Sequence, residues 1–184
     1  MKNLKKLTIL HSNDMHGDFL AEQIDQRLVG SGAIRSYSLG PVVHYADLVE
    51  CLPYDDAVYM LKVTGAQLER MLRHVLRDEA FQGEHTEFYQ FSHGMHIVWS
   101  RSAQTFRTLT LDGEALYADR LYTVAMQKYH YNNLKAFLNI TLEEAEENGR
   151  TRVLSTSARD VVEEYLMVNQ HLNRRVEGRL VVED

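Results

Sequence analysis

The clearest hydrophobic pattern in the chain is helical and begins at Gly65. Apolar side chains recur there at three- and four-residue spacing, which predicts an amphipathic helix; they are Leu68, Met71, Leu72, Val75 and Leu76. A shorter helix is predicted over residues 44–52 and ends before Pro53. Thr141 with Glu144 forms a capping-box pattern for a helix to about residue 148. Ser157 is placed to cap a last helix, which has its own apolar face.

Strand-like stretches lie between the predicted helices, and they cover residues 57–64, 88–100, 106–111, 121–127 and 176–182. Asp112-Gly113 is a typical turn sequence between two of them. Near the N-terminus, the apolar residues 7–11 predict a strand that ends in a polar loop. Residues 18–28 predict a helical turn or a linker, and residues 30–32 predict a flexible loop. Strands and helices are interspersed without regular β-α-β repetition, so we expect an α+β fold with a mixed, mainly antiparallel sheet and packed helices.

Composition narrows the classes of partner. The 184 residues are 45% hydrophobic and 25% charged, which is typical of a globular domain, and the net charge of −6 predicts no binding to nucleic acid or to an anionic membrane. Cys51 is the only cysteine, so no disulfide can form within the chain, and we interpret it as a buried packing residue. No apolar stretch has the length of a signal peptide or a membrane span. We therefore expect a cytoplasmic protein.

The loop after the N-terminal strand contains Asp14-Met15-His16-Gly17. A carboxylate and an imidazole two residues apart at a strand end can bind one divalent metal, and Gly17 permits a sharp exit from the loop. The pair Asp14 and His16 is a weak signal by itself. A polar surface loop is the alternative interpretation of this segment.

Residues 7–17 are similar to the opening of the metallophosphoesterase domain of 5′-nucleotidases and related cyclic-nucleotide phosphodiesterases. The resemblance implies that Asp14 and His16 are metal ligands of a two-metal centre that holds Mn, Zn or a similar divalent ion. The later family motifs, Gly-Asn-His-Glu and Gly-His-x-His, are missing from this sequence. A two-metal site needs six or more ligands, so we expect no stable metal binding and negligible phosphatase activity from this chain alone. The catalytic domain is largely deleted in this interpretation.

Most of the remaining chain, residues 28–182, resembles the substrate-binding C-terminal domain of the same family. Four segments carry the likeness: Ser31-Gly-Ala-Ile-Arg35, the stretch 42–54 that ends in Pro-Tyr, residues 61–68 with Thr-Gly before a helix, and the strand segment 121–125. The implied organisation is a remnant strand and metal loop over residues 1–28, followed by a substrate-binding domain over residues 29–184.

The resemblance implies a nucleotide pocket with an arginine for the anionic end of the substrate and two aromatic rings for the base. These roles fall on Arg35, Tyr54 and Tyr129. An arginine fork suits phosphate or carboxylate, and two aromatic faces can stack a base with little sequence preference. The alternatives are a surface ion pair for Arg35 and ordinary packing for the tyrosines. His130, beside Tyr129, is the best histidine candidate for a ligand contact.

Three positions depart from the family pattern. Gly30 and Asp56 each replace an asparagine, and Lys135 stands where the family has a ribose-binding aspartate. A cation at Lys135 would favour a ligand with an additional phosphate, or it would mean that the pocket no longer takes a nucleoside. We keep Asp56 and Lys135 as substrate-site candidates.

Two functions follow from these expectations. The first is a nucleotide-recognition domain of a metal-dependent phosphohydrolase that acts in nucleotide catabolism, with a small nucleotide or nucleoside-like ligand. The alternative is a non-catalytic interaction or regulatory module that reuses the fold. In either case residues 7–11 have lost their parent sheet and present an apolar edge, which we expect to pair with another copy of the chain or to fold back.

Overall fold

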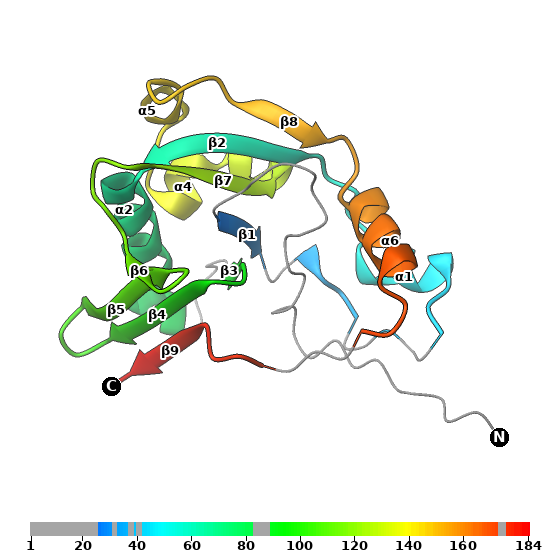
Figure 1. Ribbon diagram of the computed structural model, residues 1–184, viewed down its shortest axis with the longest axis horizontal. Coiled ribbons are helices and arrows are strands. Elements are labelled where there is room, and N and C mark those ends of the chain that lie inside the picture. The colour runs from blue at the N-terminus through cyan, green and yellow to red at the C-terminus, as the bar shows by residue number, and fades with distance from the viewer. Residues whose placement is uncertain (1–25, 31–32, 37–38, 40–41, 83–88, 173–175) are drawn as a thin grey trace.

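The computed structural model describes residues 26–30 as backbone, and residues 33–36, 39, 42–82, 89–172 and 176–184 in full. The expected strand at residues 7–11 and the pair Asp14 and His16 lie outside these ranges. The elements in chain order (Figure 1) are β1 (Gln26–Gly30), α1 (Tyr45–Cys51), β2 (Val58–Thr64), α2 (Gly65–Val75), the 3-10 helix η3 (Asp78–Phe81), β3 (Tyr89–Phe91), β4 (Met95–Ser100), β5 (Thr105–Leu111), β6 (Glu114–Ala115), β7 (Leu121–Gln127), α3 (Lys128–Asn132), α4 (Leu134–Leu138), α5 (Leu142–Glu146), β8 (Arg152–Ser155), α6 (Ala158–Val168) and β9 (Leu180–Glu183).

The described strands form two sheets. The larger has the order β3-β1-β7-β2-β8, and the smaller has the order β6-β5-β4-β9. Within the described residues, the β1–β7 and β4–β9 pairs are parallel and the other five pairs are antiparallel. The expected class, α+β with a mixed and mainly antiparallel sheet, is confirmed.

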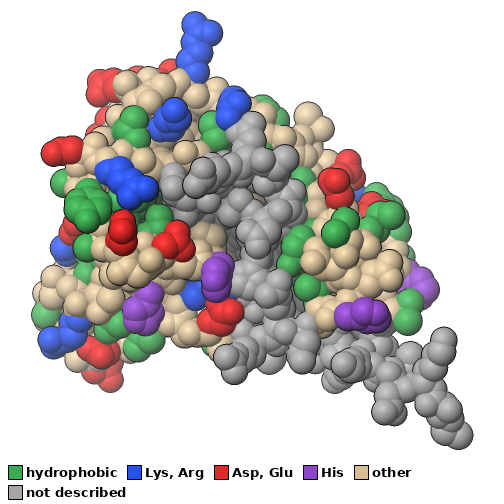
Figure 2. Space-filling view, in the orientation of Figure 1, with side chains coloured by type: hydrophobic (Ala, Val, Ile, Leu, Met, Phe, Trp, Pro, Cys, Tyr) green, Lys and Arg blue, Asp and Glu red, His purple; other side chains and the backbone are tan. Residues whose placement is uncertain are grey.

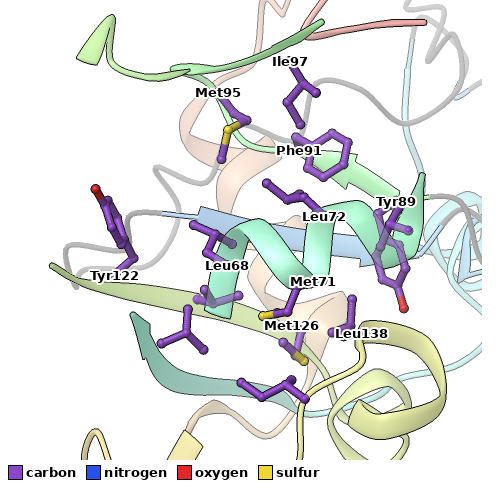
Figure 3. Close-up of a cluster of buried hydrophobic side chains, with 14 of the residues drawn as sticks. Leu68, Met71, Leu72, Tyr89, Phe91, Met95, Ile97, Tyr122, Met126 and Leu138 are labelled. Carbon is purple, nitrogen blue, oxygen red and sulfur yellow. The ribbon is translucent and has the colours of Figure 1, made fainter. Parts of the chain in front are cut away.

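Helix α2 lies between the two sheets and supplies much of the core (Figure 3). Its predicted apolar face is confirmed, because all five of its side chains are almost fully buried: Leu68, Met71, Leu72, Val75 and Leu76. They meet apolar side chains of β4 and β7, such as Ile97 and Met126. Burying each large aliphatic side chain contributes about 1.5–3 kcal/mol relative to exposure, so this helix holds the two sheets together.

A second, smaller cluster joins α1 to α6, which lie side by side at the right of Figure 1. Leu48 and Cys51 of α1 pack there against Val162 of α6, and Leu39 and Leu52 complete the buried set. The predicted burial of Cys51 is confirmed. None of the described helices has the length and apolar character that a membrane span needs.

The helix caps follow the sequence closely. Thr141 and Glu144 form the predicted capping box of α5, and the Ser157 side chain accepts a hydrogen bond from Asp160 N–H at the start of α6. Thr64 and Gln67 form a further capping box at the start of α2.

Several elements differ from the prediction. Residues 26–30 form a strand inside the larger sheet, so the linker expected to residue 28 and the loop expected from Gly30 were wrong there. Strand β9 begins at Leu180 rather than at residue 176. The short elements β6, β8, α3 and α4 were not predicted, because each has five residues or fewer and little internal periodicity. The proposed division of the chain after residue 28 stays a prediction, although β1 runs across it.

Helix α2 begins with a glycine, Gly65, because the loop that packs on it leaves no space for a side chain. The N–H of Gly65 donates to the carbonyl of Arg120 at 2.9 Å, and the N–H of Ala66 donates to that of Ala118 at 3.0 Å. The loop after β6 therefore satisfies the first amides of the helix. A Cβ on Gly65 would collide with the carbonyl oxygen of Tyr117, which is backbone and cannot turn away.

We predict that Gly65→Ala lowers the free energy of unfolding by about 1–3 kcal/mol, because the methyl group must displace this loop. The gain in helix propensity is smaller than the clash. Urea unfolding would measure the change. Ala66→Ser, at the exposed neighbouring position, should stay within about 0.5 kcal/mol of the parent chain. Equal stability of Gly65→Ala and the parent would show that the loop does not constrain this position.

Candidate functional site

The candidate site lies where the paired strands β2 and β7 end. Val58 pairs with Gln127, and one step further the N–H of Lys128 donates to the carbonyl of Ala57 at 2.8 Å. The segment before β2 carries Tyr54, and the segment after β7 carries Tyr129. These two tyrosines therefore flank the same end of the strand pair, although they are far apart in sequence.

Arg35 lies against Tyr54. The N–H of Arg35 donates to the carbonyl of Cys51 at 2.8 Å, which fixes its backbone to the end of α1. Its guanidinium carbon lies 5.3 Å from the centroid of the Tyr54 ring, and Nη2 is 3.5 Å from the Tyr54 hydroxyl. The first distance is that of a cation–π contact, and the second is at the long limit of a hydrogen bond. The structure therefore brings two predicted site residues together.

Both tyrosines are about half exposed. Tyr54 is 55% exposed and Tyr129 is 51% exposed. The Tyr129 ring packs on Phe137, with ring centroids 5.6 Å apart. The backbone carbonyl of Tyr129 accepts a hydrogen bond from the Asn133 side chain at 2.8 Å. The ring thus contacts α4 through Phe137, while the residue as a whole stays half exposed. This combination of support and exposure suits a stacking surface.

His130 lies in the core rather than on the surface. It is only 2% exposed, its Nδ1 is 2.9 Å from the Tyr89 hydroxyl, and its ring meets the Tyr89 ring edge-on. Burial lowers the pKa of His130 from 6.5 to about 4. In the described structure the His130 ring also meets the Tyr129 ring edge-on, with ring centroids 5.4 Å apart. A direct ligand contact by His130 stays a prediction.

The other candidates occupy different places. Asp56 is half-buried, and its carbonyl accepts a hydrogen bond from Ala158 N–H at 2.9 Å. Lys135 is exposed on α4 and donates from Nζ to Asn139 Oδ1 at 3.1 Å. Hydrogen bonds from the Thr141 N–H and from the Arg70 side chain lower the pKa of Glu144 in α5, and the charge of Lys135 adds a smaller effect. The roles predicted for Asp56 and Lys135 in ligand binding remain predictions.

The sequence alone did not indicate a role for Asp55, which lies beside Tyr54. The Asp55 carboxylate accepts hydrogen bonds from the Ser157 hydroxyl at 2.8 Å and the Arg159 N–H at 3.0 Å. Burial alone would raise the pKa of Asp55, but these hydrogen bonds and the charge of Arg159 outweigh it, so the pKa of Asp55 is lowered. Ser157 gave a local signal as a helix cap. Its hydrogen bond to Asp55, more than a hundred residues earlier, left no signal in the sequence.

The face of the molecule shown in Figure 2 carries both signs of charge. On the described part of the face shown in Figure 2, Lys and Arg side chains are interspersed with Asp and Glu. Within the described residues, no three His, Cys, Asp or Glu side chains are grouped closely enough to hold a metal ion.

Comparison with known proteins identifies the family to which the sequence belongs. The model of the 5′-nucleotidase C-terminal domain matches residues 22–140, which is more than half of the chain and includes Arg35, Tyr54 and Tyr129. No curated protein matches the sequence.

Three solved structures show the same fold. The 5′-nucleotidase precursor from Thermus thermophilus has a TM-score of 0.68 and 16% identity, over 88% of this chain and 32% of its own. The NAD nucleotidase of Haemophilus influenzae has a TM-score of 0.66 and 12% identity, over 87% and 30%. The Thermus thermophilus sulfate thiohydrolase SoxB has a TM-score of 0.60 and 17% identity, over 86% and 29%. This chain thus spans about a third of the length of each.

We predict that buried His130 makes the fold sensitive to mild acid. Its pKa is about 4 in the folded chain and ordinarily 6.5, so the unfolded chain binds the extra proton first as the pH falls. The free energy of unfolding should therefore decrease from pH 6.5 to pH 4, by on the order of 3 kcal/mol from this residue.

Urea unfolding at several pH values would measure this dependence. His130→Gln should remove most of the slope between pH 6.5 and pH 5, where few carboxylates titrate, whereas His96→Gln at an exposed position of β4 should retain it. A slope that is the same in His130→Gln and in the parent chain would contradict the prediction.

Proposed function

This chain belongs to the 5′-nucleotidase C-terminal domain family, and we propose that it recognises a small nucleotide or nucleoside-like ligand at the shared end of β2 and β7. The observation that carries the proposal is the pair of half-exposed tyrosines, Tyr54 and Tyr129, on the two segments joined by the Ala57–Lys128 hydrogen bond. Arg35 lies beside the first of them. The ligand would be stacked by the rings and anchored at its anionic end by the guanidinium.

Each part of the proposed site contributes in a different way. Stacking of a base on an aromatic ring is worth about 1–3 kcal/mol in single-strand binding proteins, and it tolerates different bases. Arg35 adds charge-assisted hydrogen bonds to a phosphate or carboxylate. Its present contact with the Tyr54 hydroxyl, at 3.5 Å, is long enough to be given up at little cost.

We further propose that this chain binds its ligand without hydrolysing it unaided. The two-metal chemistry of the resembling hydrolases needs more ligands than Asp14 and His16 provide. The relatives named above are about three times as long, so hydrolysis would depend on a further domain. That domain would be supplied by another chain or by additional sequence.

We predict that Tyr54→Ala weakens binding of a nucleoside monophosphate by about 5- to 150-fold, because one stacking surface is lost. Tyr129→Ala should act similarly. Arg35→Met should weaken nucleoside monophosphates but leave uncharged nucleosides within about threefold, because only the anionic group is affected. Isothermal titration calorimetry with a panel of monophosphates and nucleosides measures these changes.

Tyr117→Ala provides the matched control, because Tyr117 is also an exposed tyrosine but precedes the opposite end of β7. It should bind as the parent does. Failure of the parent chain to bind any nucleotide, nucleoside or sugar nucleotide would reject the proposal and favour a non-catalytic interaction module. Binding that survives all three site substitutions would place the ligand elsewhere.

A further inference from the structure

The turn that carries Tyr54 is held from a distant helix. Arg159, in the first turn of α6, donates from Nη2 to the carbonyl of Leu52 at 3.0 Å and from Nε to the same oxygen at 3.3 Å. Nη2 also lies 3.4 Å from the carbonyl of Pro53. Arg159 therefore binds the two backbone carbonyls that immediately precede Tyr54.

A second set of contacts fixes the other side of Tyr54. The Arg159 N–H donates to Asp55 Oδ1 at 3.0 Å, and Nη1 lies 3.8 Å from Asp55 Oδ2. The Ser157 hydroxyl donates to the same carboxylate at 2.8 Å. Tyr54 is thus flanked by residues that α6 holds directly. The side chain of Arg159 is only 13% exposed, so its guanidinium is largely removed from water.

The ring of Tyr54 depends on this backbone for its position. It is 55% exposed, and the interaction described for its side chain is with Arg35, which is itself exposed. A side chain with so little packing takes its direction mainly from its Cα and Cβ. The planar, five-donor guanidinium of arginine can bridge several carbonyls at once, which a lysine ammonium on a flexible stem does less well.

We propose that Arg159 is a positioning residue of the nucleotide site: it fixes residues 52–55 so that the Tyr54 ring faces the bound base. This inference rests on the proposed function and extends it to a residue outside the segment that the family model matches. Arg159 does not touch the ligand. It acts through Tyr54, so its effect concerns the base and not the anionic end of the ligand.

A purely structural role for Arg159 would have a different signature. It would join α6 to the end of α1 and lower stability when lost, without distinguishing between ligands. The comparison of a nucleoside monophosphate with ribose 5-phosphate separates the two roles, because ribose 5-phosphate keeps the phosphate and lacks the base. A double-mutant cycle with Tyr54→Ala tests whether Arg159 acts through that ring.

The experiment measures both ligands by calorimetry on the full chain with Arg159→Met, Arg159→Lys and the control Arg70→Met. Arg70 forms an ion pair with Glu144 at 2.6 Å, so its loss also removes a guanidinium contact, but on α2. Thermal melting of each variant fixes an assay temperature at which all are folded. If Arg159→Met does not fold, Arg159→Lys replaces it, because it keeps the charge beside Asp55.

We expect Arg159→Met to weaken the nucleoside monophosphate by about 5- to 30-fold, part of the full stacking contribution, and ribose 5-phosphate by less than about twofold. Arg159→Lys should weaken the nucleotide nearly as much, and Arg70→Met should leave it unchanged. In the Tyr54→Ala background, Arg159→Met should have no further effect.

Equal weakening of both ligands, or the full effect of Arg159→Met in the Tyr54→Ala background, would overturn the positioning role. If Tyr54→Ala strongly weakens nucleotide binding while Arg159→Met binds as the parent chain does, the positioning role is overturned and the proposed function stands. If Tyr54→Ala itself leaves nucleotide affinity unchanged, the proposed function fails and the positioning role fails with it.

Discussion

The antiparallel pairing of β2 with β7 is the constraint on which the core and the candidate site both depend. Seven residue pairs are in register from Val58–Gln127 to Thr64–Leu121. This register directs Leu61 with Val124 to the α2 side of the sheet, and a slip of β2 by one residue would turn Leu61 away from the core. The same register sets where the strand pair ends. It therefore determines that the segments carrying Tyr54 and Tyr129 leave the sheet together.

Elements with a strong local signal could be predicted from the sequence. The face of α2, the caps of α5 and α6 and the bounds of β7 all follow from spacing or from a few adjacent residues. Strand β1 could not, because its place between β3 and β7 depends on partners far along the chain. Helices α3 and α4 are too short for periodicity to show and are stabilised by packing on the sheet instead. Local patterns thus predict individual helices and strands better than the pairing and packing between segments that are distant in the sequence.

The site shows the same division between local and distant signals. The sequence segment around Arg35 and the Pro53-Tyr54 pair carried a family likeness, and the structure brings Arg35 and Tyr54 into contact. The burial of His130 was harder to predict, because its polar neighbours in the sequence gave no indication that its side chain packs on Tyr89. The hydrogen bonds of Arg159 with residues 52–55 join positions more than a hundred residues apart, so no local pattern could indicate them.

The shared fold accommodates different chemistries, since the similar structures include a 5′-nucleotidase, an NAD nucleotidase and a sulfate thiohydrolase. The ligand that we propose for this chain must therefore be inferred from its own side chains. A crystal structure of the chain with a bound nucleoside monophosphate is the most direct test of the shared site. We expect the base between the rings of Tyr54 and Tyr129 and the phosphate at the Arg35 guanidinium. A base that contacts neither ring would contradict the proposed function.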